Sequence, residues 1–333
     1  TQKVVHMITG EVSYKLAVYQ NQFYVLLSSA LFGLLSLRLS SSFGVPSRHA
    51  LILGLSTQLL YQTFPVNLFY YTGIYPSAVL MIFLMIFLIE LIKIYRNDKI
   101  VVASNDKILF ISVFMMAYVD LYSTIIFVFF FLFVLHVLDG SLLSNIKLTR
   151  NLIAPLGLAL VLFIIQLIWV KFYFDATFVS STLSFRTGFD GDNIKYLTHA
   201  NLIFHRIRQG SMVYQWYPLM GFCVVSAIIY WALNIFQLGK EKLPIILFLA
   251  SVGIYLPYAL FFTQSVVIHA KMHDPYMVAP LILIGFSMLP ASLEQRNQFQ
   301  GYYVFLFAIL AFFFSMYNIR LFALEYPTFI NMY

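Results

Sequence analysis

The sequence is poor in charge. Only 10% of its 333 residues are Asp, Glu, Lys or Arg, whereas 61% are hydrophobic. A soluble domain has about 25% charged residues, and the mean hydropathy of +0.86 excludes an ordinary soluble domain. The composition therefore predicts an all-α, polytopic transmembrane helical bundle, with residues 1–333 forming a single transmembrane domain.

Cysteine is nearly absent, and several chemistries are excluded with it. Cys223 is the only cysteine, so cysteines alone build no intrachain disulfide, zinc site or iron–sulfur cluster. The glycine-rich loops GxxxxGK[ST] and GxGxxG are also missing, so nucleotide binding through them has no support. His269 and His273 are four residues apart, but Pro275 follows at once. We therefore predict no metal site, identify no cofactor and expect no nucleic-acid partner.

Long apolar segments are abundant, and they predict nine or ten membrane crossings. A helix needs about 20 apolar residues to span a bilayer core. The segments lie at residues 22–41, 49–66, 76–95, 107–119, 121–138, 152–172, 213–236, 243–263, 275–292 and 301–320. The segments 107–119 and 121–138 are short, so we expect two crossings that meet at a turn near Asp120 under a recessed outer surface. Asp120 would be costly at mid-membrane, which favours this turn.

Lys and Arg in the short connections predict the orientation, because cytoplasmic loops are enriched in both. If the crossings alternate, one face receives Arg48, Lys93, Arg96, Lys99, Lys107, Lys147, Arg150, Lys240, Lys242 and Arg296. That face is predicted to be cytoplasmic. Glu90 and Arg38 lie near cytoplasmic helix ends, where long side chains extend to the interface. The outer face receives residues 1–20, 171–212 and 264–274. The sequence begins with Thr1 rather than Met, and we therefore expect a truncated N-terminus.

The outer segment 171–212 carries basic residues on the face where they are less common. Its stretch KYLTHANLIFHRIRQG (residues 195–210) gathers apolar residues on one helical face: Tyr196, Ala200, Ile203 and Ile207. This pattern predicts an amphipathic helix in the membrane interface. Arg206 and Arg208 then lie at headgroup level and suit an anionic lipid phosphate. A merely solvated helix is the alternative.

A late polar stretch, HAKMHDPYMVAP (His269–Pro280), lies between two apolar runs at the outer surface. An ordinary loop with solvated charges is one reading of it. Together with AYVDLYSTIIF, YYTGIYPSAVLMIFLMIFLIELI and the outer loop with a surface helix, this stretch resembles the layout of the GT-C superfamily. These are polytopic glycosyltransferases, such as protein O-mannosyltransferases and lipid A aminoarabinose transferases. The resemblance covers most of the chain.

The resemblance implies sugar transfer from a polyprenyl-phosphate-linked donor to an acceptor on the non-cytoplasmic face, in a bacterial inner membrane or a eukaryotic endomembrane. In the family, a basic residue in a late loop lies near the donor phosphate and is followed by an aromatic residue and a proline. Lys271, Tyr276 and Pro280 occur in this order here. The family's acidic motif occupies the first outer loop, and the resemblance implies that the chain begins near the end of that loop, with Glu11 as its remaining carboxylate.

Such a transfer needs a carboxylate to activate the acceptor and cations to stabilise the departing phosphate. We assign catalysis to Glu11 and Asp120. The expected substrate-binding residues are Lys271, His269, His273, Tyr276, Arg206, Arg208 and Tyr71. Two other functions stay open: a non-catalytic membrane subunit or scaffold whose partners are other membrane subunits and lipids, and a polysaccharide polymerase-like or lipid-handling protein.

Overall fold

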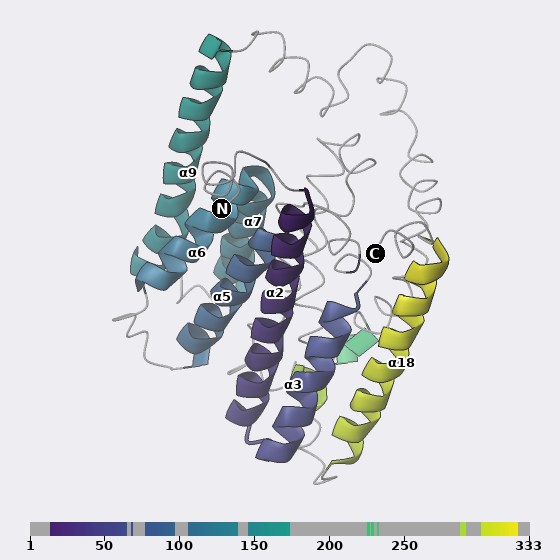
Figure 1. Ribbon diagram of the computed structural model, residues 1–333. Helices are drawn as coiled ribbons and strands as arrows, with labels where there is room; N and C mark the ends of the chain where they lie inside the picture. The colour runs from purple at the N-terminus through teal and green to yellow at the C-terminus, as the bar shows by residue number, and fades with distance from the viewer. Residues whose placement is uncertain are drawn as a thin grey trace, which may run out of the picture.

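The structure is a computed structural model that describes residues 14–64, 68, 77–96, 106–138, 146–173, 225–226, 228–229, 232, 287–290 and 301–325. Within these ranges the regular structure is helical and contains no strand, as predicted. The helices are α2 (Tyr14–Ser42), α3 (Ser47–Gln62), α5 (Ser77–Arg96), α6 (Asp106–Val119), α7 (Leu121–Leu138), α9 (Ile146–Tyr173) and α18 (Tyr302–Glu325) (Figure 1).

Three of these helices are long and apolar enough to cross a membrane, over Leu16–Ser41, Leu148–Trp169 and Tyr302–Leu324. Shorter apolar stretches occupy α5, α6 and α7, at Ala78–Leu91, Lys107–Val119 and Ser123–Val137. The predicted crossings at 213–236 and 243–263 and the amphipathic helix at 195–210 fall wholly or mostly outside the described residues. The full count of nine or ten crossings therefore stays a prediction.

Helix α2 begins earlier than the sequence predicts. Its apolar segment was expected from residue 22, yet the helix starts at Tyr14. The polar residues Gln20, Asn21 and Gln22 lower the local hydropathy, but Asn21 is buried, as are Ala17 and Val18 on the preceding turn. Residues 14–20 of the expected outer segment 1–20 are therefore part of a long helix that packs into the bundle.

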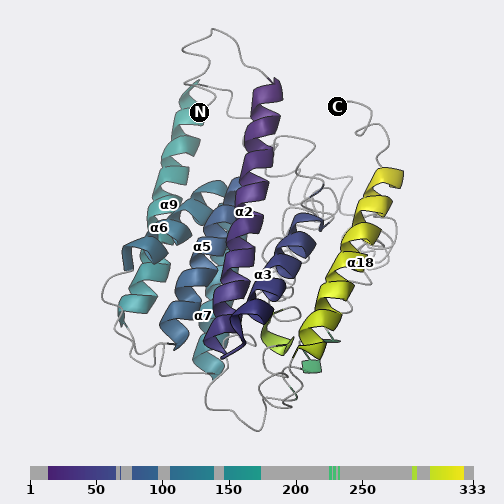
Figure 2. The same cartoon turned by 60° about the horizontal axis from the view of Figure 1, so that its bottom comes forward.

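Helix α2 lies at the centre of the described bundle and packs against α3 on one side and α5 on another (Figures 1 and 2). The row continues from α5 to α6 and from α6 to α9, while α7 contacts both α6 and α9. Helix α18 packs on the far side of α3. The hydroxyl of Ser36 on α2 also hydrogen-bonds that of Ser287, so α2 joins elements from distant parts of the sequence.

The turn between α2 and α3 follows directly from the sequence Ser-Phe-Gly-Val-Pro-Ser. Gly44 has a φ of +81°, which glycine adopts without steric cost. The amide of Val45 donates to the carbonyl of Ser40 at 3.2 Å, and that of Gly44 to Ser41 at 3.0 Å. These bonds form a Schellman motif, which caps the end of α2. Pro46 then precedes the first residue of α3.

Helices α2 and α3 approach closely where Gly33 faces Gly54. A Cβ atom added to either glycine would lie 3.0 Å from the carbonyl oxygen of the other, and one on Gly33 would also lie 2.9 Å from the Cβ of Gln58. Small residues permit such close backbone contact, on which helix association in membranes depends. Thr57 lies one turn further along α3, and its hydroxyl donates to the carbonyls of Leu53 and Gly54 at 2.8 and 3.0 Å.

Helix α18 starts beside the start of α3. Gly301 has a φ of +86°, and a Cβ atom built on it would lie 2.9 Å from Nε2 of His49. The two helices therefore run in the same direction from one end of the bundle, which also contains the Gly44 turn. We call this the Gly44 end. The opposite end, where α2 begins and α18 finishes, is the Asp120 end (Figures 1 and 2).

The glycine contact gives a stability prediction. Gly33→Ala and Gly54→Ala should each lower the free energy of unfolding by about 1–3 kcal/mol, because the added methyl group meets backbone that cannot move freely. Gly157→Ala on α9 is the matched control, since its Cβ would have no neighbour within 4 Å. It should raise stability by up to about 1 kcal/mol through helix propensity. Thermal unfolding in detergent measures all three, and equal effects would contradict the close α2–α3 contact.

Candidate functional site: the Asp120 turn and the Glu90–Lys93 pair

Asp120 alone joins α6 to α7, so the predicted break in segment 107–138 is confirmed. The Oδ1 atom of Asp120 accepts a hydrogen bond from the backbone amide of Ser123 at 3.2 Å. The Asp120 carbonyl accepts from the amide of Thr124 at 3.2 Å, and the Asp120 amide donates to Met116 at 2.9 Å. Asp120 is therefore the N-cap of α7, a position that favours Asp because its carboxylate satisfies an otherwise unpaired amide.

The Asp120 turn lies well short of the end of α9. Helix α6 has 14 residues and α9 has 28, which at a rise of about 1.5 Å per residue gives about 21 and 42 Å. In both Figures 1 and 2, α9 extends beyond the turn. The buried apolar residues along α9 end at Ala159. Exposed apolar side chains follow: Leu160, Val161, Ile164, Ile165, Ile168, Trp169 and Phe172.

The Asp120 side chain is partly exposed at this turn, and two roles are open to it. As a cap it needs one carboxylate oxygen and the charge contributes little, because Asn caps a helix equally well. As the catalytic base assigned to it from the sequence, it needs the negative charge to accept a proton. The two roles are separable by experiment, because Asp120→Asn retains one and removes the other.

Glu90 corrects one expectation from the sequence. Arg38 is exposed near the end of α2, as expected for a side chain that extends to the interface, but Glu90 is only 3% exposed. Its Oε1 atom accepts a hydrogen bond from Nζ of Lys93 at 2.6 Å, and the Lys93 side chain is 42% exposed. Oε2 is buried and has no hydrogen-bond partner in the part of the chain that the structure describes. Glu90 is thus buried inside the bundle and paired with a lysine at its edge.

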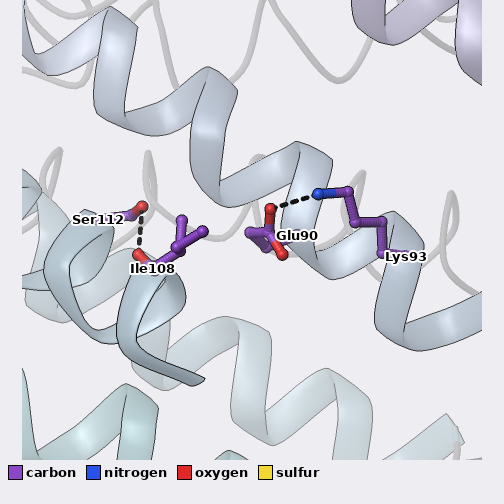
Figure 3. Close-up of polar contacts among 4 residues, drawn as sticks. All are labelled: Glu90, Lys93, Ile108 and Ser112. Carbon is purple, nitrogen blue, oxygen red and sulfur yellow. Dashed lines mark hydrogen bonds and ion pairs between the residues drawn. The ribbon is translucent and has the colours of Figure 1, made fainter. Parts of the chain in front are cut away.

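Tight helix packing buries Glu90. Figure 3 shows its carboxylate between Lys93 and the α6 residues Ile108 and Ser112. The Ser112 hydroxyl donates to the carbonyl of Ile108 at 2.7 Å. One turn nearer the Asp120 end, Phe87 packs edge-on against two rings of α7.

These rings are Phe127 and Phe131, with centroids 5.9 and 6.1 Å from that of Phe87. All three aromatic residues are buried. They lie between Glu90 and the Asp120 end of the bundle. The Glu90–Lys93 pair therefore belongs to the Gly44 end, and the carboxylates of Glu90 and Asp120 form separate polar features.

Asp120 is the predicted site residue whose position the structure describes. The other candidates lie outside the described ranges: Glu11, Tyr71, Arg206, Arg208, His269, Lys271, His273 and Tyr276. Among the residues described, no group of three or more His, Cys, Asp or Glu side chains could hold a metal ion. In comparisons with known proteins, no family model, curated protein or solved structure matches the chain.

Sequence reasoning missed a second set of buried polar groups. Ser315 and Asn318 on α18, and Asn151 on α9, are all at most 5% exposed. The signal available for α18 is its spacing, because Ser315 and Asn318 continue the face that begins with Val304, Phe307 and Ala311. That spacing alone does not tell whether the face meets protein or lipid.

Removal of either partner of the Glu90–Lys93 pair should have unequal effects. Lys93→Met leaves a buried carboxylate without a counter-charge and should cost about 3 kcal/mol of unfolding free energy. Glu90→Gln leaves a lysine that can extend into water, so the cost should be about 1 kcal/mol or less. The double variant should recover most of the loss. Denaturant unfolding in detergent measures the three values, and equal single-variant losses would show that Glu90 reaches water by itself.

Proposed function

We propose that the protein is a multi-pass membrane protein whose Gly44 end faces the cytoplasm. The exposed basic residues at this end support the orientation: Arg48, Lys93, Lys107 and Arg150. The parallel course of α3 and α18 also fits, because it requires an even number of crossings between their starts. The eight segments predicted between residues 49 and 292 satisfy this condition when α6 and α7 count as two.

Within this frame we propose that the chain is a glycosyltransferase that uses a polyprenyl-phosphate-linked sugar at its non-cytoplasmic face. The observation that carries the proposal is the Asp120 turn. It holds a partly exposed carboxylate above two short apolar helices, beside a longer helix with exposed apolar side chains. A lipid-linked donor needs such a combination, because its chain stays in the bilayer while its sugar phosphate lies at the headgroup level.

The proposed chemistry is one displacement. The carboxylate of Glu11 or Asp120 accepts the proton of an acceptor hydroxyl while the hydroxyl oxygen attacks the anomeric carbon of the sugar. The bond from this carbon to the phosphate oxygen breaks, and polyprenyl phosphate leaves. Lys271, with Arg206 or Arg208, stabilises the negative charge of the leaving phosphate. His269, His273, Tyr276 and Tyr71 contact donor or acceptor.

The orientation can be tested with single cysteines in a Cys223→Ser background. Ser47→Cys and Lys107→Cys, at the Gly44 end, should react with a membrane-impermeant maleimide only after the membrane is opened. Ser184→Cys and Thr198→Cys, in the predicted outer segment 171–212, should react in sealed cells or vesicles of known orientation. Labelling in the reverse pattern would overturn both the orientation and the proposed location of the reaction.

The catalytic roles predict large losses of turnover without unfolding. Lys271→Ala should reduce transfer by about 100- to 1000-fold, as loss of one charge-stabilising group does, and Lys271→Arg should recover part of it. Asp120→Asn should leave the melting temperature unchanged because Asn also caps α7, yet should lower transfer at least about 100-fold if the carboxylate is the base.

The assay is turnover of purified protein with single polyprenyl-phosphate sugars, with the melting temperature measured in parallel. Full activity of Asp120→Asn would leave Glu11 as the base and restrict Asp120 to capping. Full activity of Lys271→Ala would remove the phosphate role of that lysine. Absence of transfer by the wild-type protein with every donor would favour the non-catalytic subunit.

A further inference from the structure

The inward face of α18 changes character along its length. From the Gly44 end it presents the buried apolar residues Val304, Phe307 and Ala311, and then the buried polar residues Ser315 and Asn318. Ser315 is 1% exposed and Asn318 0%. The Ser315 hydroxyl oxygen and both amide atoms of Asn318 have no hydrogen-bond partner within the described residues. Three unsatisfied polar atoms therefore lie within one turn of one helix.

Several other buried serine hydroxyl groups in the bundle are satisfied by their own helices, although the hydroxyl of Thr149, like that of Ser315, has no partner within the described residues. Ser28 donates to the carbonyl of Val25 at 2.9 Å, Ser40 to that of Ser36 at 2.8 Å, and Ser112 to that of Ile108 at 2.7 Å. Serine in an apolar helix commonly makes this local bond. Ser315 does not make it, although the carbonyl of Ala311 is one turn away. The Ser315 hydroxyl thus remains available to a partner outside its own helix.

A buried amide without a partner destabilises a fold, because it has given up its hydrogen bonds to water. Such a group in a native protein calls for an explanation, such as a bound water or ion, a ligand or a functional role. A leucine of similar size would fill the same space without this cost. The unsatisfied pair on α18 therefore points to a polar partner rather than to packing alone.

The pair lies in the half of the bundle nearer the Asp120 end. Ser315 and Asn318 follow Gly301, which is beside His49, by about 21 and 25 Å at the helical rise of about 1.5 Å per residue. From His49 to Gln62, the last residue of α3, the distance is about 20 Å by the same rise. Because the two helices run in the same direction from this shared level, Ser315 is level with the C-terminal end of α3 and Asn318 lies about one turn beyond it.

We propose that Ser315 and Asn318 bind hydroxyl groups of a neutral sugar headgroup. The Asn318 amide donates through Nδ2 and accepts through Oδ1, so it matches two neighbouring hydroxyl groups, and the Ser315 hydroxyl matches a third. An anion fits less well, because Oδ1 would face it. That this sugar belongs to a polyprenyl-linked donor rests on the proposed function, whereas the hydroxyl recognition does not. Because both residues are buried, binding requires the C-terminal part of α18 to move outward.

The binding chemistry can be tested without any transfer reaction. The probe is octyl β-glucoside, compared with octyl tetraoxyethylene ether, which has the same alkyl chain but no sugar. Added to protein in nanodiscs, the glucoside should raise the melting temperature of the wild-type protein more than the ether does. Asn318→Ala and Ser315→Ala should abolish that difference. Met316→Ala and Ile319→Ala, exposed on the same turns, are the controls and should retain it. An equal response of wild-type protein and Asn318→Ala would overturn the proposal.

The melting temperature of Asn318→Leu provides a second test, because a purely structural role of the amide predicts the opposite change. If the amide has no partner in the unliganded protein, replacing it with an apolar side chain of similar size should leave the melting temperature unchanged or raise it. If the amide instead bonds to another part of the chain, the melting temperature should fall, which would overturn the proposal even if glucoside binding is lost.

The donor assay separates this inference from the proposed function. With transfer established, Asn318→Ala should raise KM for the donor about 10-fold, the effect of one to two lost hydrogen bonds, and should change kcat by less than about 2-fold if the bonds persist equally in the transition state. Glucoside binding that depends on Asn318 in a protein without transfer activity would support the sugar site and contradict the glycosyltransferase. A changed kcat with an unchanged KM would contradict the sugar site.

Discussion

The contact of α2 with α3 at Gly33 and Gly54 sets the spacing from which the described bundle is built. With a hydrogen atom in place of a side chain at each glycine, the backbones come so close that a Cβ atom built on either one would lie 3.0 Å from the carbonyl oxygen of the other. Association of apolar helices in lipid depends on such packing, because lipid tails are as apolar as the side chains they replace. Since α2 also contacts α5 and Ser287, a displaced α2 would disturb three interfaces.

Local features of the sequence predicted local features of the fold. The helical character, the break at Asp120 and the ends of α6 and α7 followed from apolar segments and one carboxylate between them. The start of α2 did not, because Gln20, Asn21 and Gln22 interrupt the hydropathy although Asn21 packs inside the bundle. Hydropathy reports the average polarity of a segment, whereas packing of individual side chains against α3 and α5 decides which polar residues can be buried.

The inward and outward faces of these helices could not be distinguished from the sequence. On α18, Phe307 is buried while Phe305, Phe312 and Phe313 are exposed, because both lipid and protein interior accept phenylalanine. A soluble helix marks its outward face with charge, and this signal is absent here. Consequently, Glu90 was expected at the interface although it is buried, and Asn318 was not identified as a buried polar residue. Asp120 was identified because it interrupts an apolar segment along the chain, a signal that does not depend on which face of a helix is buried.

The contact at the start of α18 restricts movement there more than at the other end of the helix. Gly301 has a positive φ and lies beside His49, where a Cβ atom built on it would be 2.9 Å from Nε2, and we infer from this contact that the helix is held at the Gly44 end. Movement is then largest at the far end, as for a lever with a fixed pivot. A tilt of about 10° about Gly301 would displace Asn318, about 25 Å away, by about 4 Å, more than the diameter of a water molecule. A small angular change at one membrane surface would thus open space near the other.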